Sequence, residues 1–272
     1  MPLELPATLS PSKVVSFRDC ALSFRFSVID RLPEPPSAAA CKGTLVHKAL
    51  EHLYERPADE RVLDAALADL DRARVEIMAS AEYAGLCFGS DDDEAAFHAS
   101  AETLVRKYFQ LEDPRLVRPI GLELFLSTPL DVAGRVALRG IIDRLELDED
   151  GELVVTDYKT GRAPSERFEQ GRLTGVHFYS YLCEKLFGRR PSRIQLLYLA
   201  EPVAIIATPS DQSTRGLERK VGAIWQAIER ACERDDFRPK PGALCSWCSF
   251  KDYCPAFGGD PARATELLAT AS

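Results

Sequence analysis

The sequence predicts an α/β protein with a helical elaboration before its sheet. Apolar residues recur at the helical period through residues 43–115, and strand-length apolar or alternating runs fill residues 117–208. The helical period returns over residues 211–235. No internal repeat and no linker-like stretch separates these regions, so we expect a single domain spanning residues 1–272.

The first half of the chain is expected to be mainly helical. Residues 1–11 are rich in proline and should form a loose arm. Residues 12–26 read as a short amphipathic helix that holds Cys20, and the prolines of residues 33–36 end it. Further helical periods cover residues 43–55, about 58–86 and 92–111.

After Pro114 the pattern changes to strands. The turn signal Asp148-Glu-Asp-Gly151 separates two apolar runs, so these runs should form an antiparallel hairpin. The expected strands are 120–126, 136–147, 153–158, 193–199 and 202–207, with helices at 179–187 and 213–234. The tail, 237–257, has no regular period.

Composition narrows the class of protein. Of the 272 residues 46% are hydrophobic, yet no run reaches the roughly 18 apolar residues that a membrane span needs. The first residues offer neither a basic segment nor an apolar segment of the secretory type. We therefore expect a cytoplasmic protein. Its net charge of −8 means that any contact with nucleic acid must come from a local basic surface.

The hairpin carries the most informative group of side chains. Because side chains alternate along a strand, Asp157 and Lys159 should share one face while Tyr158 points to the other. Asp143 ends the partner strand at a similar distance from the turn, so the two aspartates should lie opposite each other. Facing carboxylates repel, and a bound Mg²⁺ or Mn²⁺ would remove that conflict. The plainer alternative is an ordinary surface ion pair between Asp157 and Lys159.

Two further places in the sequence offer possible metal ligands. His47 and Glu51 are four residues apart, so they share one face of the helix expected at 43–55 and can point together at a metal. A histidine such as His47, taken alone, is more often a partly buried polar group. Glu123, between two leucines on an expected strand, is either a further acidic ligand or a solvated strand residue.

Three segments together resemble the motifs of RecB-type nucleases of the PD-(D/E)XK superfamily. They are Gly43-Thr-Leu-Val-His47, Gly140-Ile-Ile-Asp143-Arg-Leu-Glu and Val155-Thr-Asp157-Tyr-Lys159-Thr-Gly161, in matching order and spacing. The resemblance implies a mixed sheet flanked by helices and metal-dependent cleavage of DNA phosphodiesters. It implies metal binding by His47, Asp143, Asp157 and the backbone carbonyl of Tyr158, with Lys159 as the catalytic lysine.

One motif of this family is altered. A helix reading Gln-x-x-x-Tyr usually follows, and here His177 replaces the glutamine while Tyr181 matches. The resemblance implies that both contact the substrate. Basic residues gather near the expected mouth of the site at Arg162, Arg167 and Arg172, where they can contact phosphates or form a solvated surface.

Eight cysteines in a chain without an export signal indicate thiols or metal ligands. Cys245, Cys248 and Cys254 lie within ten residues, and Cys20 is the best candidate for a fourth ligand. Spacing alone suits zinc or iron equally. RecB-type relatives, including AddB nucleases and the exonucleases of CRISPR adaptation, hold a [4Fe–4S] cluster in this arrangement. The resemblance therefore implies such a cluster, a clamp that joins segments 12–30 and 237–257.

The prediction is a metal-dependent deoxyribonuclease, a DNA exonuclease that prefers single strands and acts in repair or recombination. No P-loop occurs, so a processive enzyme would need a separate helicase as its partner. The alternative is a non-catalytic iron–sulfur protein that binds nucleic acid or senses redox state on a nuclease-like fold. The intact set of Asp143, Asp157 and Lys159 favours the enzyme.

Overall fold

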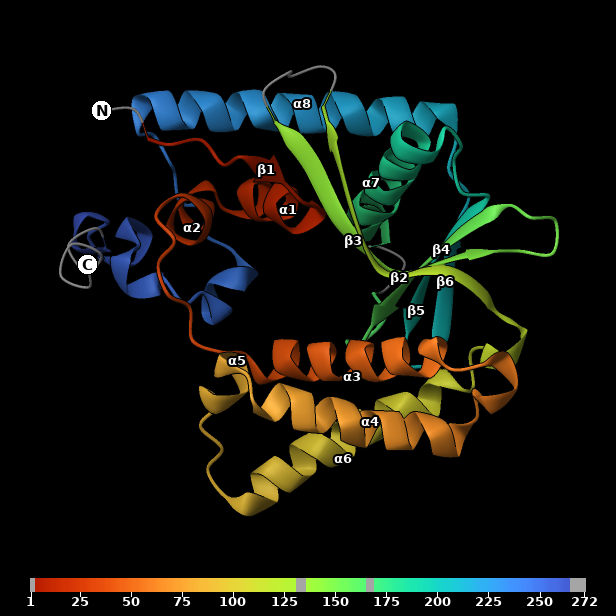
Figure 1. Ribbon diagram of the computed structural model, residues 1–272. Helices are drawn as coiled ribbons and strands as arrows, with labels where there is room; N and C mark the ends of the chain where they lie inside the picture. Colours follow the sequence, from red (N-terminus) through yellow and green to blue (C-terminus); the bar gives the residue numbers. More distant parts are fainter. Residues whose placement is uncertain (1–2, 131–135, 165–168, 265–272) are drawn as a thin grey trace. The chain divides into compact units, whose positions relative to one another are not determined.

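The computed structural model describes residues 3–130, 136–164 and 169–264, without the side chains of residues 169–174 (Figure 1). The chain divides into two compact units. Unit 1 consists of Met1–Pro35, Ser127–Gly140 and Gln212–Ser272. Unit 2 consists of Pro36–Leu126 and Ile141–Asp211. The expectation of a single domain over residues 1–272 stays a prediction.

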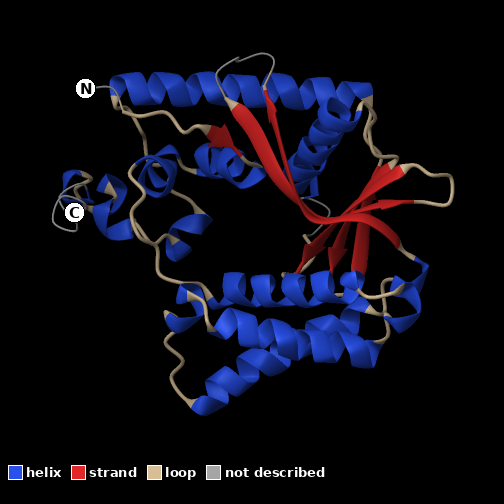
Figure 2. Cartoon of the chain, in the orientation of Figure 1, coloured by secondary structure: helices blue, strands red, loops and turns tan. Residues whose placement is uncertain are grey.

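The strands form a mixed sheet, which confirms the expected α/β fold with helices flanking a central sheet (Figure 2). Strands follow the order β1-β3-β4-β5-β6, and β2 pairs with β3. The β3–β4 and β5–β6 pairs are antiparallel, whereas β1–β3 and β4–β5 are parallel. The strands are β1 (Thr8–Leu9), β2 (Arg118–Pro129), β3 (Ala137–Leu147), β4 (Leu153–Lys159), β5 (Arg193–Tyr198) and β6 (Val203–Ala207).

The predicted hairpin is present between β3 and β4. Gly151 adopts a left-handed conformation with φ of 76°, which glycine tolerates without steric cost. The carboxylate of Asp148 accepts hydrogen bonds from the backbone N–H groups of Asp150 (3.1 Å) and Glu152 (2.8 Å). Arg144 pairs with Thr156, and the same register continued by one residue puts Asp143 opposite Asp157.

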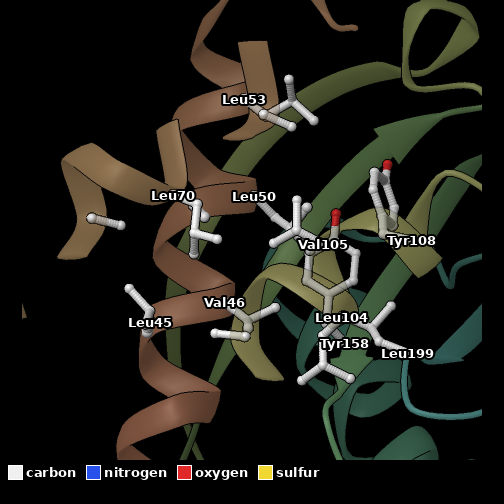
Figure 3. Close-up of a cluster of buried hydrophobic side chains, with 14 of the residues drawn as sticks. Leu45, Val46, Leu50, Leu53, Leu70, Leu104, Val105, Tyr108, Tyr158 and Leu199 are labelled. Carbon is white, nitrogen blue, oxygen red and sulfur yellow. The ribbon is translucent and has the colours of Figure 1, made fainter. Parts of the chain in front are cut away.

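Helices of unit 2 surround a core built against the sheet. Buried leucines and valines of α3 and α6 meet Tyr158 of β4 and Leu199, which follows β5 (Figure 3). Helices α3 and α4 pack along each other, and α6 contacts both. The helices are α3 (Ala38–Glu55), η2 (Ala58–Glu60), α4 (Leu63–Met78), α5 (Ala81–Ala84), α6 (Asp91–Tyr108), η3 (Pro114–Leu116) and α7 (Glu169–Phe187).

Unit 1 contains the two ends of the chain and one long helix, α8 (Asp211–Arg234), whose first residue belongs to unit 2. Its apolar face buries Trp225 and Ile228. Besides β1 and the adjoining parts of β2 and β3, unit 1 contains short helices and helical turns. They are α1 (Pro11–Asp19), α2 (Ala21–Phe24), the π-helix η1 (Arg25–Ile29), and the 3₁₀ turns η5 (Ala243–Trp247), η6 (Lys251–Tyr253) and η7 (Pro255–Phe257).

Two expectations about the N-terminal residues were wrong. The arm 1–11 contains β1, which pairs with β3 through Leu9 and Leu138. The expected helix 12–26 is interrupted at Cys20, whose extended backbone (φ −158°, ψ 110°) separates α1 from α2. Cys20 therefore lies between two helices rather than inside one.

Within the ranges given above, no helix combines the length and the apolar character needed to cross a membrane.

Candidate active site

The two aspartates of the hairpin are buried, Asp143 in the middle of β3 and Asp157 near the end of β4. Asp143 is 8% exposed and Asp157 is 4% exposed. A carboxylate oxygen of Asp143 accepts a hydrogen bond of 2.6 Å from the backbone N–H of Tyr158. This bond fixes the Asp143 side chain against β4, beside Asp157.

Helix α3 brings His47 to the same place. Its Nε2 lies 3.1 Å from the carbonyl oxygen of Tyr158, which can only accept, so Nε2 carries the proton. Nδ1 then presents a lone pair, and it lies 3.6 Å from Asp143 and 4.0 Å from Glu123. A neutral imidazole in this tautomer is the form that binds a metal.

Strand β2 contributes Glu123 through a local change in its backbone. Glu123 has φ of 42°, a left-handed value that is costly for a residue with a Cβ atom. Before it the even-numbered residues, such as Ile120, are exposed, whereas after it the even-numbered Leu126 is buried. The strand therefore reverses its faces at Glu123, as a bulge does, and turns this carboxylate toward His47.

His47, Glu123 and Asp143 offer ligand atoms that all lie within 4.8 Å of one another, and could hold a metal ion. One imidazole nitrogen and two carboxylate oxygens suit a divalent cation of intermediate hardness. Asp157, which the family resemblance also implies as a ligand, is not in this group. Glu51 is not in it either, because its carboxylate pairs with Lys48 at 2.8 Å.

Lys159 stands beside the group on the same face of β4 as Asp157, as predicted, and its Nζ forms an ion pair with the Asp157 carboxylate. Burial alone would lower the pKa of Lys159, but the carboxylates of Asp157 and Asp143 outweigh it and raise the pKa. Lys159 is therefore a cation at neutral pH. It is 35% exposed, so it remains accessible to a substrate.

Crowding of acidic groups shifts the other pKa values in this site. Burial and then the charge of Asp157 raise the pKa of Asp143 well above its ordinary value. Burial and then Asp143 raise the pKa of Glu123 to about 7. Burial lowers the pKa of His47, although nearby carboxylates act in the opposite direction. A cation bound among these carboxylates would stabilise their charged forms.

Helix α7 adds a contact that the sequence analysis did not assign to the site. The hydroxyl of Tyr179 donates a hydrogen bond of 3.2 Å to Asp157. Burial raises the pKa of Tyr179 well above its ordinary value, so the hydroxyl keeps its proton. Tyr179 stands two residues before the predicted Tyr181, and a step of two residues turns a helix by about 200°.

The residues predicted to contact the substrate are not gathered in one place. Tyr181 is 1% exposed, with its ring under the Lys185 ammonium. His177 is half-buried on α7. Arg162 is 88% exposed and lies 3.9 Å from Glu201. Arg167 lies outside the described residues, and the side chain of Arg172 is also not described.

The four cysteines predicted to bind a second metal centre lie in unit 1. Cys20, Cys245, Cys248 and Cys254 line one pocket together with Phe26 and other apolar residues. All four are free thiols and are partly exposed. No three of their sulfur atoms lie within 4.8 Å of one another. Of the remaining cysteines, Cys41, Cys183 and Cys232 are buried, whereas Cys87 is exposed.

A mixed sheet whose hairpin carries Asp143, Asp157 and Lys159 beside a histidine and a glutamate defines a nuclease-type fold with a candidate metal site. The sequence model of the PD-(D/E)XK nuclease superfamily matches residues 8–255. The chain belongs to this superfamily of nucleases, which act on nucleic acids and use a divalent metal ion.

Individual relatives are distant. The Gene 69 protein of Mycobacterium phage D29 is 24% identical over 278 residues, which cover 94% of this chain and 98% of that protein. An uncharacterized protein of Rickettsia conorii is 25% identical over 126 residues, or 46% of this chain and 15% of that one. The "Putative exonuclease" from Eubacterium rectale has a similar fold, with a TM-score of 0.55 at 13% identity over 89% of this chain and 87% of that one.

Proposed function

We propose that this protein is a metal-dependent deoxyribonuclease that removes nucleotides from DNA ends, prefers single strands and serves DNA repair or recombination. The observation that carries the proposal is the group of His47, Glu123 and Asp143 beside the cationic Lys159. Three acidic side chains converge at Asp143, Asp157 and Glu123, and they need a cation before a phosphate can approach.

The donor atoms fit a divalent ion. His47 would bind through Nδ1 because its Nε2 proton is held by Tyr158, and Asp143 and Glu123 would bind through carboxylate oxygens. Asp157 and the carbonyl of Tyr158 complete the set that the family motif implies. A bound Mg²⁺ or Mn²⁺ would activate water and neutralise charge on the phosphate oxygens.

The protein itself would supply three actions. Lys159 places a fixed positive charge where the phosphodiester gains negative charge in the transition state. Asp157 holds the Lys159 ammonium, and Tyr179 in turn holds Asp157. Arg162 would contact a phosphate outside the site, because its guanidinium is almost fully exposed.

The test is degradation of end-labelled single-stranded DNA by anaerobically purified protein with Mn²⁺ or Mg²⁺. We expect Lys159→Ala to lower kcat by about 10²–10³-fold. Arg106→Ala removes a surface cation that pairs with Glu102 on α6, and it should leave the rate unchanged. Equal rates for wild type and Lys159→Ala, or none in either, would contradict the proposal. Cleavage of circular single-stranded DNA, which has no ends, would contradict an exonuclease.

For unit 1 we propose a [4Fe–4S] cluster held by Cys20, Cys245, Cys248 and Cys254. The shared pocket supports a common metal centre for residues that lie 225 positions apart in sequence. Four thiolates suit zinc or iron equally, and the resemblance to RecB-type nucleases favours the iron–sulfur cluster.

Assays of iron and acid-labile sulfide on anaerobically purified protein decide this question. We expect about four iron and four sulfide per chain in wild type. Cys20→Ser should lose most of both, whereas Cys183→Ser changes a buried thiol outside the pocket and should retain them. Stoichiometric zinc without sulfide would contradict the cluster, and so would a full complement of iron in Cys20→Ser.

The non-catalytic alternative makes a separate prediction. A protein that only binds DNA or senses redox state would keep DNA affinity and lack metal-dependent hydrolysis in the assay above. The convergence of Lys159, Asp157 and the histidine-carboxylate group supports the enzyme instead.

A further inference from the structure

Directly behind the candidate metal site, unit 2 buries a charged side chain that the proposed chemistry does not use. Arg144 follows Asp143 on β3 and is 0% exposed. Because side chains alternate along a strand, its guanidinium lies on the face opposite the metal site. An arginine buried to this degree is rare unless its hydrogen-bonding groups are paired.

The guanidinium is satisfied by partners from several elements. Glu112 receives two of its hydrogen bonds, at 2.5 and 2.9 Å, and Glu146 receives one at 2.5 Å. It also donates to the hydroxyls of Tyr54 (2.5 Å), Tyr158 (2.9 Å) and Thr156 (3.1 Å). We call this set of residues the Arg144 hub.

The hub joins α3 and β3, two of the three elements that supply the metal site, to β4. Tyr54 belongs to α3, which carries His47; Arg144 belongs to β3, which carries Asp143. Thr156 and Tyr158 belong to β4, and Glu112 follows α6. Burial would raise the pKa of Glu112, but Arg144 and the hydroxyls of Tyr108 and Tyr54 outweigh it and lower the pKa. Glu112 is therefore an anion paired with the arginine.

Tyr158 connects the two faces directly. Its hydroxyl accepts from Arg144, whereas its peptide lies in the site on the other side of the strand. The backbone N–H of Tyr158 holds Asp143 at 2.6 Å, and its carbonyl holds His47 at 3.1 Å. A shift of the Tyr158 ring would therefore move the two side chains that the metal needs in fixed positions.

Stability alone gives little reason for an arginine here. Replacing a buried ion pair by apolar residues of similar volume is often neutral or stabilising, because the charges lose their hydration. The planar guanidinium fixes the relative positions of its partners, because its rigid N–H groups donate hydrogen bonds in several directions at once. Ligands of a metal site depend on such outer partners for their orientation.

We propose that Arg144 is a positioning residue that sets the affinity of the site for its divalent metal by fixing the Tyr158 peptide against His47 and Asp143. This inference rests on the proposed metal site. Arg144 itself touches neither the metal ligands' donor atoms nor the substrate.

The experiment measures Mn²⁺ affinity of the full-length protein by electron paramagnetic resonance of free Mn²⁺, with no DNA present. Arg144→Lys keeps the charge but loses the fork, so its single ammonium cannot bridge Glu112, Tyr158 and Thr156 together. We expect the Kd for Mn²⁺ to rise about 10–100-fold, the usual effect of removing an outer partner. High Mn²⁺ should restore most of the nuclease rate, because the chemistry of Lys159 is intact.

A matched control separates positioning from general loss of stability. Asp69→Asn breaks another ion pair of unit 2, in which the buried Asp69 of α4 accepts from Arg56, the residue after α3, at 2.7 and 2.8 Å. This pair lies outside the hub. We expect Asp69→Asn to lower the melting temperature and to leave the Kd for Mn²⁺ within twofold, at a temperature where both variants are folded.

Tyr158→Phe covers the case in which Arg144→Lys does not fold. It removes one hydroxyl at 2.9 Å and keeps the ring and the peptide, so it should raise the Kd several-fold in the same direction. Wild-type affinity in Arg144→Lys, or in Tyr158→Phe if the first does not fold, would overturn the inference and leave the proposed nuclease standing. An equal rise in Asp69→Asn would also overturn it. Absence of Mn²⁺ binding in wild type would instead overturn the metal site, and the inference with it.

Discussion

The residue that makes the candidate site most sensitive to pH is Glu123. Its pKa is raised to about 7, by burial and then by the charge of Asp143. In the unfolded chain the same carboxyl titrates near its ordinary value of 4.5. Between these two values the folded, metal-free protein holds more protons than the unfolded chain. The contribution of this group to stability is therefore complete below about pH 4.5 and is lost as the pH rises through about 7.

We expect Glu123→Gln to remove this loss in the metal-free protein. The melting temperature of the variant should exceed that of wild type by an amount that grows from pH 5 to pH 8, measured by circular dichroism in chelator. Saturating Mn²⁺ should reverse the order at pH 8, because only the wild-type carboxylate binds the ion. A difference between the two proteins that is independent of pH would show that Glu123 titrates normally.

Tyr179 shows what sequence analysis misses at the scale of one residue. The spacing of His177 and Tyr181 fits a family motif, yet Tyr179 is the residue that contacts Asp157. The position of a residue along a helix decides the direction in which its side chain points. Helix α7 begins at Glu169, ten residues before the helix expected from the sequence. The sequence shows several aromatic residues in this helix. Which of them contacts Asp157 depends on how the helix is oriented, and the sequence does not give that orientation.

At the scale of elements, the β3–β4 hairpin should tolerate loss of its turn contacts. Asp148→Ala removes the acceptor for the backbone N–H groups of Asp150 and Glu152. Contacts of Arg144 with Thr156 and Tyr158 still hold the strands in register. We therefore expect a melting temperature lower by a few degrees and a nuclease rate at 20 °C within twofold of wild type. A large loss of activity would show that the turn sets the register.

Asp150→Ala is the matched control for this turn. The side chain of Asp150 is exposed, and its backbone N–H still reaches Asp148 after the substitution. Its melting temperature should equal that of wild type. A drop as large as that of Asp148→Ala would mean that charge rather than the backbone contacts of Asp148 stabilises the turn.

Elements with a strong local signal were predictable from the sequence. The turn residues 148–151 between two apolar runs predicted the hairpin, and the continuous apolar period predicted α8. The bulge at Glu123 and the break at Cys20 were not predictable, because tertiary contacts impose both conformations on residues without a local preference for them. The shared face of Asp157 and Lys159 was predictable because side chains alternate along a regular strand. The orientation of Glu123 was not predictable because the backbone there departs from regular strand geometry.

The whole molecule distributes its charge unevenly. Unit 2, which contains the candidate active site, has 29 acidic against 19 basic residues, whereas unit 1 has 13 against 15. A polyanion approaching the site therefore meets a negative unit, and a bound cation would relieve the repulsion.

We expect DNA affinity to depend on the metal. With Ca²⁺ as an ion that binds carboxylates, the Kd for single-stranded DNA, measured by fluorescence anisotropy, should be at least about tenfold lower than in chelator. Asp143→Asn should lose this dependence because it removes one ligand. Equal affinity with Ca²⁺ and with chelator in wild type would place the main DNA contacts away from the proposed site.

The most direct measurement is anomalous X-ray diffraction near the manganese absorption edge from crystals soaked in Mn²⁺. The account predicts an anomalous peak within bonding distance of His47 Nδ1 and of carboxylate oxygens of Asp143 and Glu123. A crystal that shows no peak there, from a preparation that degrades DNA with Mn²⁺, would contradict it.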